Sequence, residues 1–372
     1  VAKGEGVWTI IDLLEHKDLK DVRGLVYFDY SKVATDALNF KEAQEFFVSY
    51  GTEAKNLTEN ELNNDMPEVA WDLLKMDKYR AHNWHCLGFT DKRTPYASIY
   101  TSLSCNFKCS FCMIHSIFGN DYKMRLWSVE NIIKQIDKLY HQYGVRNIKI
   151  TDEMFMMYKK QVHSICDALI EKNYKDLNIW CYARIDTVRE DYLPKLVKAG
   201  IKWLALGIES GSKYVRDEAD KHFTQDDIRE VVKKLQDAGV NVIGNYIFGL
   251  PDDTFESMQE TLNLALELKC EMVNFYCAIS YPGSELYSLA LQKNLTLPEE
   301  WEDYSQHGYK FIPMATESLT SEQILKFRDE AFQKYFTDEA YLNYIEQKFG
   351  SETVLHILKI VKVKLKRKLL GD

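Results

Sequence analysis

The sequence predicts an α/β fold: a partial (β/α)6 barrel of the TIM type, with a small N-terminal α+β segment and a helical C-terminal extension. From about residue 96 onward, six short apolar segments typical of buried strands alternate with amphipathic segments typical of helices. This alternation favours a parallel sheet whose strands are joined by crossover helices. Six strand–helix units are fewer than the eight of a closed barrel, and functional residues are expected at the carboxyl ends of the strands.

The individual elements follow from local patterns. Strands are predicted at residues 96–103, 147–151, 178–183, 202–206, 241–248 and 272–278, and helices at residues 128–143, 159–172, 190–199, 225–238 and 254–268. Ser128 is expected to cap the first of these helices, and Gly144, Gly200 and Gly239 directly follow the ends of three helices.

The chain divides by pattern into three expected domains, residues 1–95, 96–286 and 287–372. The first contains a short helix near residues 9–15, a hairpin strand at 23–29 and a polar loop or linker at 52–65. The last is helical over residues 321–335 and 338–349, and ends in an apolar, basic segment over 356–370.

Composition limits the class of protein. The chain has 372 residues, 46% of them hydrophobic and 28% charged, with a net charge of -9. This charge favours no global attraction to nucleic acid, so no nucleic-acid partner is expected. No apolar run approaches the roughly 20 residues of a membrane-spanning helix. Five of the eight cysteines are scattered, which indicates a reducing cytoplasm rather than a secreted disulfide framework.

The other three cysteines form a motif on the loop that leaves the first strand. Cys105, Cys109 and Cys112 have the spacing C-x3-C-x2-C. Three thiolates can hold three irons of a 4Fe–4S cluster and leave the fourth iron open, whereas clusters that only transfer electrons usually take four cysteines. An open position is where a substrate or cofactor binds a metal. The alternatives are three buried structural cysteines, or a zinc site completed by His115.

Together with Phe111, which directly precedes the third cysteine, this spacing resembles the signature of the radical S-adenosylmethionine (SAM) superfamily, over about residues 96–286. The resemblance implies that the amino and carboxylate groups of SAM chelate the open iron. It also implies that an electron from the cluster breaks the sulfonium–C5′ bond, and that the resulting 5′-deoxyadenosyl radical takes a hydrogen from the substrate. The cofactors carry out this chemistry, and the protein positions them and excludes water.

Further residues that match the family lie at the ends of successive predicted strands. The resemblance implies contacts to SAM from the backbone at Phe111, the acidic pair Asp152 and Glu153, Arg184, Gly207, Glu209 and Gly249. Taken singly, the acidic pair could cap a helix, the arginine could form a structural ion pair and the glycines could serve turns. Their shared position at strand ends favours one site. No catalytic residue is assigned.

A narrower resemblance covers residues 4–103. Gly4-Glu5-Gly6, Gly24–Tyr27 and Pro67–Asp72 are similar to segments of cobalamin-dependent radical SAM proteins, which include methyltransferases and the anaerobic magnesium-protoporphyrin ester cyclase. In those proteins the first segment closes a cobalamin domain, which here would lie almost entirely before Val1. Residues 83–88 nearly match the cobalt-ligand motif Asp-x-His-x-x-Gly, a match interpreted as chance. His82, Trp84 and His85 are expected to pack the linker against the barrel, with a substrate-facing role as the alternative.

The predicted function is therefore that of a radical SAM enzyme that modifies an unactivated carbon. Cobalamin-assisted methyl transfer is the first hypothesis, oxidative cyclisation of a tetrapyrrole the second, and a non-catalytic iron–sulfur or zinc protein the third. The expected cofactors are a 4Fe–4S cluster, SAM and, in the full-length protein, cobalamin. The expected partners are a small-molecule, lipid or porphyrin substrate and a reductant such as flavodoxin or ferredoxin.

The lysines near the C-terminus leave two interpretations open. The basic residues Lys359, Lys362, Lys364, Lys366, Arg367 and Lys368 alternate with Leu and Val. A basic amphipathic helix there could bring a cytoplasmic protein to an anionic membrane, or it could be a docked helix with a solvated basic face.

Overall fold

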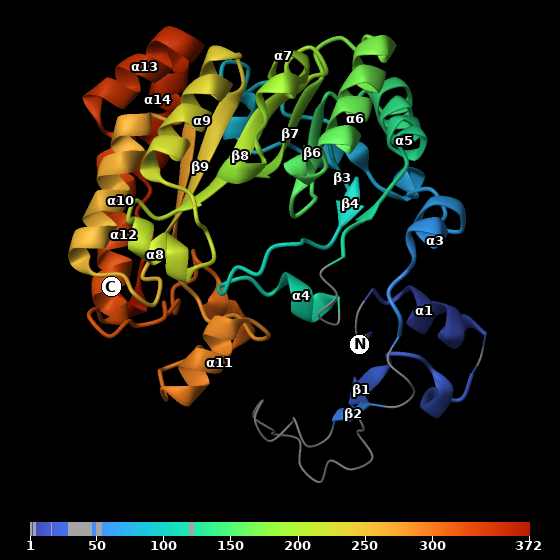
Figure 1. Ribbon diagram of the computed structural model, residues 1–372, viewed down its shortest axis with the longest axis horizontal. Coiled ribbons are helices and arrows are strands. Elements are labelled where there is room, and N and C mark those ends of the chain that lie inside the picture. Colours follow the sequence, from blue (N-terminus) through green and yellow to red (C-terminus); the bar gives the residue numbers. More distant parts are fainter. Residues whose placement is uncertain (1, 3–4, 16, 29–46, 50–53, 119–122) are drawn as a thin grey trace.

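The computed structural model describes residues 2, 5–15, 17–28, 47–49, 54–118 and 123–372. Its centre is a sheet of six parallel strands in the order β10-β9-β8-β7-β6-β3 (Figure 1). The strands are β3 (Tyr96–Ile99), β6 (Asn147–Ile150), β7 (Asn178–Arg184), β8 (Ile201–Glu209), β9 (Asn241–Phe248) and β10 (Met272–Cys277). Each strand lies beside the next one in the chain, so the predicted α/β half-barrel is confirmed.

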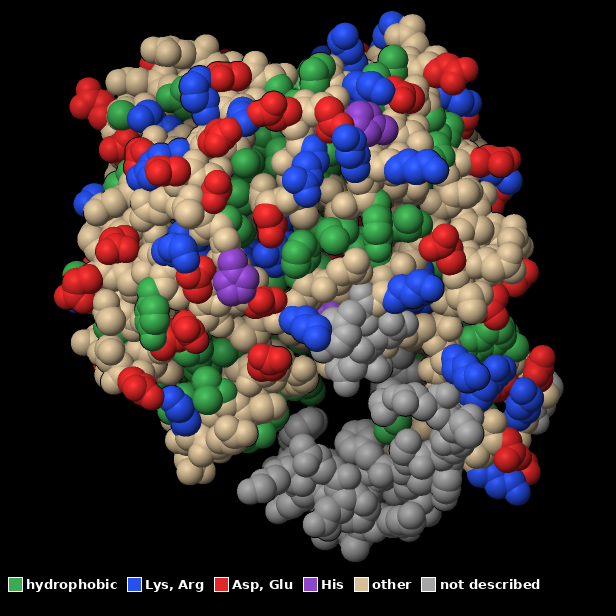
Figure 2. Space-filling model, in the orientation of Figure 1, with side chains coloured by type: hydrophobic (Ala, Val, Ile, Leu, Met, Phe, Trp, Pro, Cys, Tyr) green, Lys and Arg blue, Asp and Glu red, His purple; other side chains and the backbone are tan. Residues whose placement is uncertain are grey.

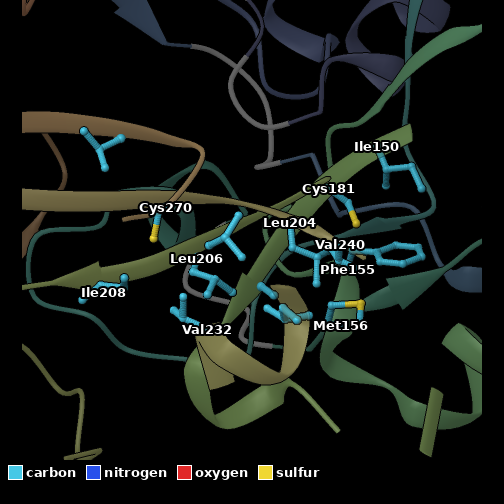
Figure 3. Packing of buried hydrophobic residues seen from close by; sticks show 14 of the residues in the cluster. Ile150, Phe155, Met156, Cys181, Leu204, Leu206, Ile208, Val232, Val240 and Cys270 are labelled. Carbon is cyan, nitrogen blue, oxygen red and sulfur yellow. The ribbon is translucent and has the colours of Figure 1, made fainter. Parts of the chain in front are cut away.

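Helices between the strands cover the outer face of the sheet (Figure 1). They are α5 (Val129–Gln142), α6 (Lys159–Lys172), α7 (Leu193–Leu196), α9 (Gln225–Asp237) and α10 (Phe255–Leu268), with α8 (Lys213–Glu218) after β8. Every second residue of a strand faces them, because side chains alternate along a strand. Leu204, Leu206 and Ile208 of β8 thus belong to the same buried cluster as Val232 of α9 (Figure 3).

The outer helices are also linked to one another at the surface. Acidic and basic side chains are intermixed on the face that Figure 2 shows. Between α9 and α10, Arg229 Nε lies 2.6 Å from Glu267 Oε1. Exposed pairs of this kind contribute little to stability, so the apolar cluster beneath them holds the helices to the sheet.

Three predicted elements differ from the structure. The strand at residues 96–103 ends at Ile99, and β4 (Ser102–Leu103) pairs instead with β5 (Arg125–Leu126), because Thr101 and Ser102 bind the Asp152 carboxylate. The helix at 190–199 is a 3-10 turn, Glu190–Tyr192, followed by the four residues of α7, which carries a proline in its first turn. The loop at 52–65 contains α3 (Glu59–Asn64), which Thr58 and Glu61 cap reciprocally.

The helical C-terminal extension covers the edge of the sheet at β10. It consists of α11 (Glu285–Gln292), α12 (Ser321–Phe336), α13 (Glu339–Phe349) and α14 (Ser351–Val361). Three of its side chains donate hydrogen bonds to β10 or the residues just before it: Arg328 Nε to Phe275 O, Tyr335 Oη to Cys270 O and Tyr341 Oη to Glu271 O. An edge strand otherwise presents unpaired backbone groups, and these donors replace a seventh strand.

The end of the chain departs from the predicted basic helix. α14 ends at Val361, so the prediction of a helix through residue 370 is wrong. Val363 is 68% exposed, whereas Arg367 is buried and pairs with Asp329 at 3.0 Å. In the part of the chain that the structure describes, no helix is both long enough and apolar enough to cross a membrane.

The N-terminal segment contains α1 (Val7–Leu14) and the antiparallel pair β1 (Val26–Phe28) and β2 (Phe47–Ser49), which confirms the predicted hairpin. Gly4 of the Gly-Glu-Gly motif lies outside the described residues. Glu5 pairs with Arg125 of β5 at 2.5 Å and accepts from the backbone of Leu57. The segment is therefore tied to the β4–β5 pair. The chain between these two strands contains the cysteine loop and then α4 (Ile114–Ile117), where that loop ends (Figure 1).

An aromatic layer closes the amino-terminal end of the half-barrel. Trp84, Trp180 and Trp203 meet edge to face at 5.0 and 5.8 Å, together with Leu87 and Phe349. We call these five residues the aromatic floor. The expected packing of Trp84 against the barrel is confirmed, with His82 stacked on it at 5.6 Å.

A first prediction concerns the edge of β10. Replacing Tyr335, which is fully buried, with Phe removes the donor to Cys270 O. We expect the free energy of unfolding to fall by about 1–3 kcal/mol, because a buried carbonyl loses its partner. Urea denaturation measures the change. Tyr214→Phe at a side chain that is 63% exposed is the control and should have little effect. An unchanged midpoint for Tyr335→Phe would contradict the edge role.

Candidate functional site

A cavity of about 420 Å3 lies at the carboxyl ends of the strands. Its walls come from the cysteine loop and from β7, β8, β9 and β10 or the residues that follow the strands. The size is that of a pocket for a small molecule. A larger cavity of about 790 Å3 between α12 and residues 360–370 contains none of the predicted site residues. The chemistry of the side chains therefore points to the smaller cavity.

All three cysteines of the motif line this cavity. Cys112 N donates to Cys109 O at 2.9 Å, and the ring of His115 lies 2.6 Å from Phe107 O, so the loop is held by its own backbone. The hydrogen bond of His115 engages the ring that the zinc alternative would use. Within the described ranges, no three His, Cys, Asp or Glu side chains are close enough to hold a single metal ion.

The thiols are in an environment that keeps them protonated until a metal binds. Burial raises the pKa of Cys105 to about 11 and raises the pKa values of Cys109 and Cys112 as well. Lys221 and Arg184 act in the opposite direction on the pKa of Cys109. Metal binding at these residues would therefore release protons, and the two cations stabilise the thiolate form.

The two adjacent acidic residues after β6 have different surroundings. Asp152 is fully buried and accepts hydrogen bonds from Thr101 N, Thr101 Oγ1 and Ser102 Oγ at 2.5–2.6 Å. It does not line the cavity; it holds the start of the cysteine loop against β6. Glu153 does line the cavity, and its Oε2 is buried without a hydrogen-bond partner among the described residues. Burial raises the pKa of Glu153 to about 7.

Arg184, the last residue of β7, connects the cavity to the cysteine loop. Its guanidinium stacks on Phe107 at 3.6 Å and lies 3.5 Å from Cys109 Sγ. It also binds the carboxylate of Asp186 through two nitrogens at 3.0 Å. Arg184 thus forms a structural ion pair and also lines the cavity, two roles that the sequence left open as alternatives.

A buried ion pair lies opposite, at the end of β8. Lys221 Nζ contacts Glu209 Oε1 at 2.5 Å and Gly207 O at 3.0 Å, and all three residues line the cavity. Glu209 has a φ of 65°, a left-handed conformation that is uncommon outside glycine and marks an irregularity in the strand pairing. A Cβ on Gly207 would lie 2.6 Å from the glutamate and 2.7 Å from the lysine. The absence of a side chain there makes room for the pair.

The loop that returns Lys221 to the cavity is fixed by Arg216 of α8. This arginine is fully buried and donates to Ser210 O at 2.6 Å and to Phe223 O at 3.1 Å. Lys221 itself was missed in the sequence, where a lysine in a polar stretch looks like a solvated loop residue. Tyr182, Asn245, Tyr276 and Gln306 also line the cavity and were missed.

The remaining predicted residues divide between the cavity and its support. Phe111 lines the cavity. Gly249 does not; it has a φ of 81° in a turn where Asp253 Oδ2 accepts from the Gly249 and Leu250 amides. The structure thus brings Phe111, Glu153, Arg184, Gly207 and Glu209 to the cavity with the cysteines, and leaves Asp152 and Gly249 behind its walls.

A half-barrel of parallel strands with three cysteines on the first strand–helix loop defines the class of protein. Residues 99–265 match the model of the radical SAM superfamily. This segment of the chain is a radical SAM domain.

Relatives and solved structures agree with this class. The chain is 28% identical over 340 residues to an uncharacterized methyltransferase, PH0819, of Pyrococcus horikoshii, covering 90% of this chain and 67% of that protein. It is 25% identical over 243 residues to the anaerobic magnesium-protoporphyrin IX monomethyl ester cyclase of Cereibacter sphaeroides, covering 64% of this chain and 38% of the cyclase. The structure of the cobalamin-dependent SAM radical enzyme OxsB with aqua-cobalamin bound shares the fold, with a TM-score of 0.65 at 17% identity.

The matches cover most of this chain but a smaller share of the longer proteins that it resembles. The match to OxsB takes in 96% of this chain but 55% of that chain. This chain therefore spans between about a third and two thirds of the proteins that it resembles.

Proposed function

We propose that Cys105, Cys109 and Cys112 hold a 4Fe–4S cluster, that SAM binds beside it in the cavity, and that the protein uses both to modify an unactivated carbon. The observation that carries this proposal is the shared cavity, in which three thiols meet two cations and two carboxylates. When bound, the cluster and SAM supply one-electron chemistry that no protein side chain provides.

The side chains fit the charged groups of SAM. Glu153 Oε2, which is buried without a partner among the described residues, suits the amino group. Arg184 and Lys221 suit the carboxylate, because each cation retains further donors besides those used for Asp186 and Glu209. Gly207 leaves space for the pair beside it. The protein's own contribution is to hold these charges in place on buried side chains, where each contact is stronger than in solution.

Methyl transfer assisted by cobalamin is the first candidate for the reaction. The relative PH0819, which is named as a methyltransferase, aligns with 90% of the chain and supports it. Oxidative cyclisation of a tetrapyrrole is the second candidate, favoured by the alignment of the cyclase with 64% of the chain. Cobalamin would be held by a domain before Val1, of which residues 1–95 form an edge and linker. Either reaction requires an external reductant such as flavodoxin or ferredoxin.

The cluster assignment predicts that Cys109→Ala abolishes both iron binding and SAM cleavage, because each thiolate holds one iron of the cluster. Cys166→Ala is the matched control: this thiol is fully buried in the core and should affect stability only. Iron content, absorbance near 400 nm and release of 5′-deoxyadenosine are measured after anaerobic reconstitution. Retained cleavage in Cys109→Ala would remove the assignment.

The SAM site predicts a specific effect of Gly207→Ala. The new methyl group would displace the Lys221–Glu209 pair, so SAM affinity should fall roughly tenfold, as expected when a charged hydrogen bond is lost. Lys221→Met should have a similar effect, and Lys233→Met on the exposed face of α9 should have none. Equilibrium dialysis of the cluster-loaded proteins measures affinity. Wild-type affinity in both site variants would exclude the pair from SAM binding.

The methyl-transfer hypothesis predicts different cobalamin binding by two lengths of chain. The 372 residues alone should stay free of cobalamin while loading the cluster, because one edge segment cannot form the open parallel sheet that binds such a cofactor. A chain extended upstream in the gene should take it up during anaerobic incubation with hydroxocobalamin. Corrinoid absorbance after gel filtration distinguishes them. If the extended chain remains free of corrinoid, cobalamin-assisted methyl transfer is refuted.

A further inference from the structure

Lys149 of β6 lies inside the half-barrel, between the aromatic floor and the cavity. Its register partners are Ser98 of β3 and Trp180 of β7. Lys149 Nζ lies 4.6 Å from the ring centroid of Trp180, which belongs to the floor, and 5.3 Å from that of Tyr182, which lines the cavity. The ammonium group is therefore one layer of side chains below the proposed SAM site.

This ammonium group has no negative partner in the part of the chain that is described. The structure gives Lys149 Nζ no ion pair and no hydrogen bond there, only the two ring contacts. Lys221, which lines the cavity above Lys149, is by contrast paired with Glu209. The rings stabilise a cation through their faces but supply no charge to neutralise it. Burial lowers the pKa of Lys149.

The surroundings of Lys149 are positive and rich in hydroxyl groups. After burial, the charges of Lys149 and Arg93 are the causes that lower the pKa of His82, so both cations act on the same region. Ser98, beside Lys149 on the neighbouring strand, is exposed, and its Oγ donates to Tyr96 Oη at 3.1 Å. A hydroxyl group that can bind an anion therefore lies on the strand next to the cation.

We infer that Lys149 binds an anionic group of the substrate, a carboxylate or a phosphate, and so holds the substrate below the cluster. This inference rests on the proposed function of the cavity above it. Lys149 lies in β6 and Glu153 lies in the turn that follows this strand. The charged end of the substrate therefore lies against Lys149 and below Tyr182, and its reacting carbon lies toward the cysteine loop.

Lysine NMR on the cluster-loaded protein tests this directly. The lysines are dimethylated with 13C, which keeps their charge, and the signal of Lys149 is assigned by its loss in Lys149→Arg. Acetate and inorganic phosphate are the probes, titrated separately at pH 7. We expect the Lys149 signal to shift saturably at a concentration at least tenfold below that which affects Lys233, an exposed lysine of α9 that serves as the internal control.

Each outcome bears on the proposal. A saturable shift with acetate indicates a carboxylate substrate, and one with phosphate indicates a phosphorylated substrate. If neither anion moves the Lys149 signal before the Lys233 signal, the anion site is refuted. Release of 5′-deoxyadenosine by the wild-type protein and by Lys233→Met, measured in parallel, tests the proposed function separately. Both proteins should release it whether or not the Lys149 signal shifts, so failure of the anion site and failure of SAM cleavage are distinguishable.

Discussion

Six parallel strands are too few to close a barrel, and the rest of the structure depends on what covers the two open edges of the sheet. At β10, side chains of the C-terminal extension bind the backbone: Arg328, Tyr335 and Tyr341 donate to three carbonyls, and Gln306 bonds to both the amide and the carbonyl of Cys277. Gln306 also lines the cavity, so one residue both covers the edge at β10 and belongs to the site. At β3, the other edge, Ser98 is exposed and lines a separate cavity with Trp127 and Asn131.

The charged side chains that line the cavity are costly to bury. Taking an ion pair out of water costs free energy that its mutual attraction offsets only in part. Arg184 and Lys221 are nevertheless 4% and 3% exposed, each with a carboxylate and each beside the cysteine loop. Glu153 Oε2 is buried without a hydrogen-bond partner among the described residues. A zwitterion that brings one positive and one negative group would complete this set.

Much of this fold could be predicted from the sequence, because strand and helix periodicity and helix caps are local. For the site, the sequence indicated only that its residues lie at the ends of the strands. Asp152 and Glu153 are adjacent, so the pattern could not decide which one faces the cavity. Lys221 reaches Glu209 only because Arg216 folds the intervening loop back, a contact that no local pattern encodes. In the C-terminal tail, apolar and basic residues alternate with period 2 over Val363–Leu365, which is typical of an extended chain. Only the basic charge of the tail suggested an amphipathic helix.

The adjacent carboxylates after β6 show how one short segment can serve both folding and ligand binding. Asp152 uses its two oxygens for three donors from Thr101 and Ser102, which fixes where the cysteine loop leaves β3. Glu153 directly follows Asp152, in a turn, so the hydrogen bonds of Asp152 behind the wall also fix the backbone from which Glu153 reaches the cavity. The loop and the Glu153 carboxylate are thus positioned by the same hydrogen bonds. Any ligand that contacts both Glu153 and the cysteine loop therefore meets a surface whose parts cannot move independently, so little conformational entropy is lost when the ligand binds.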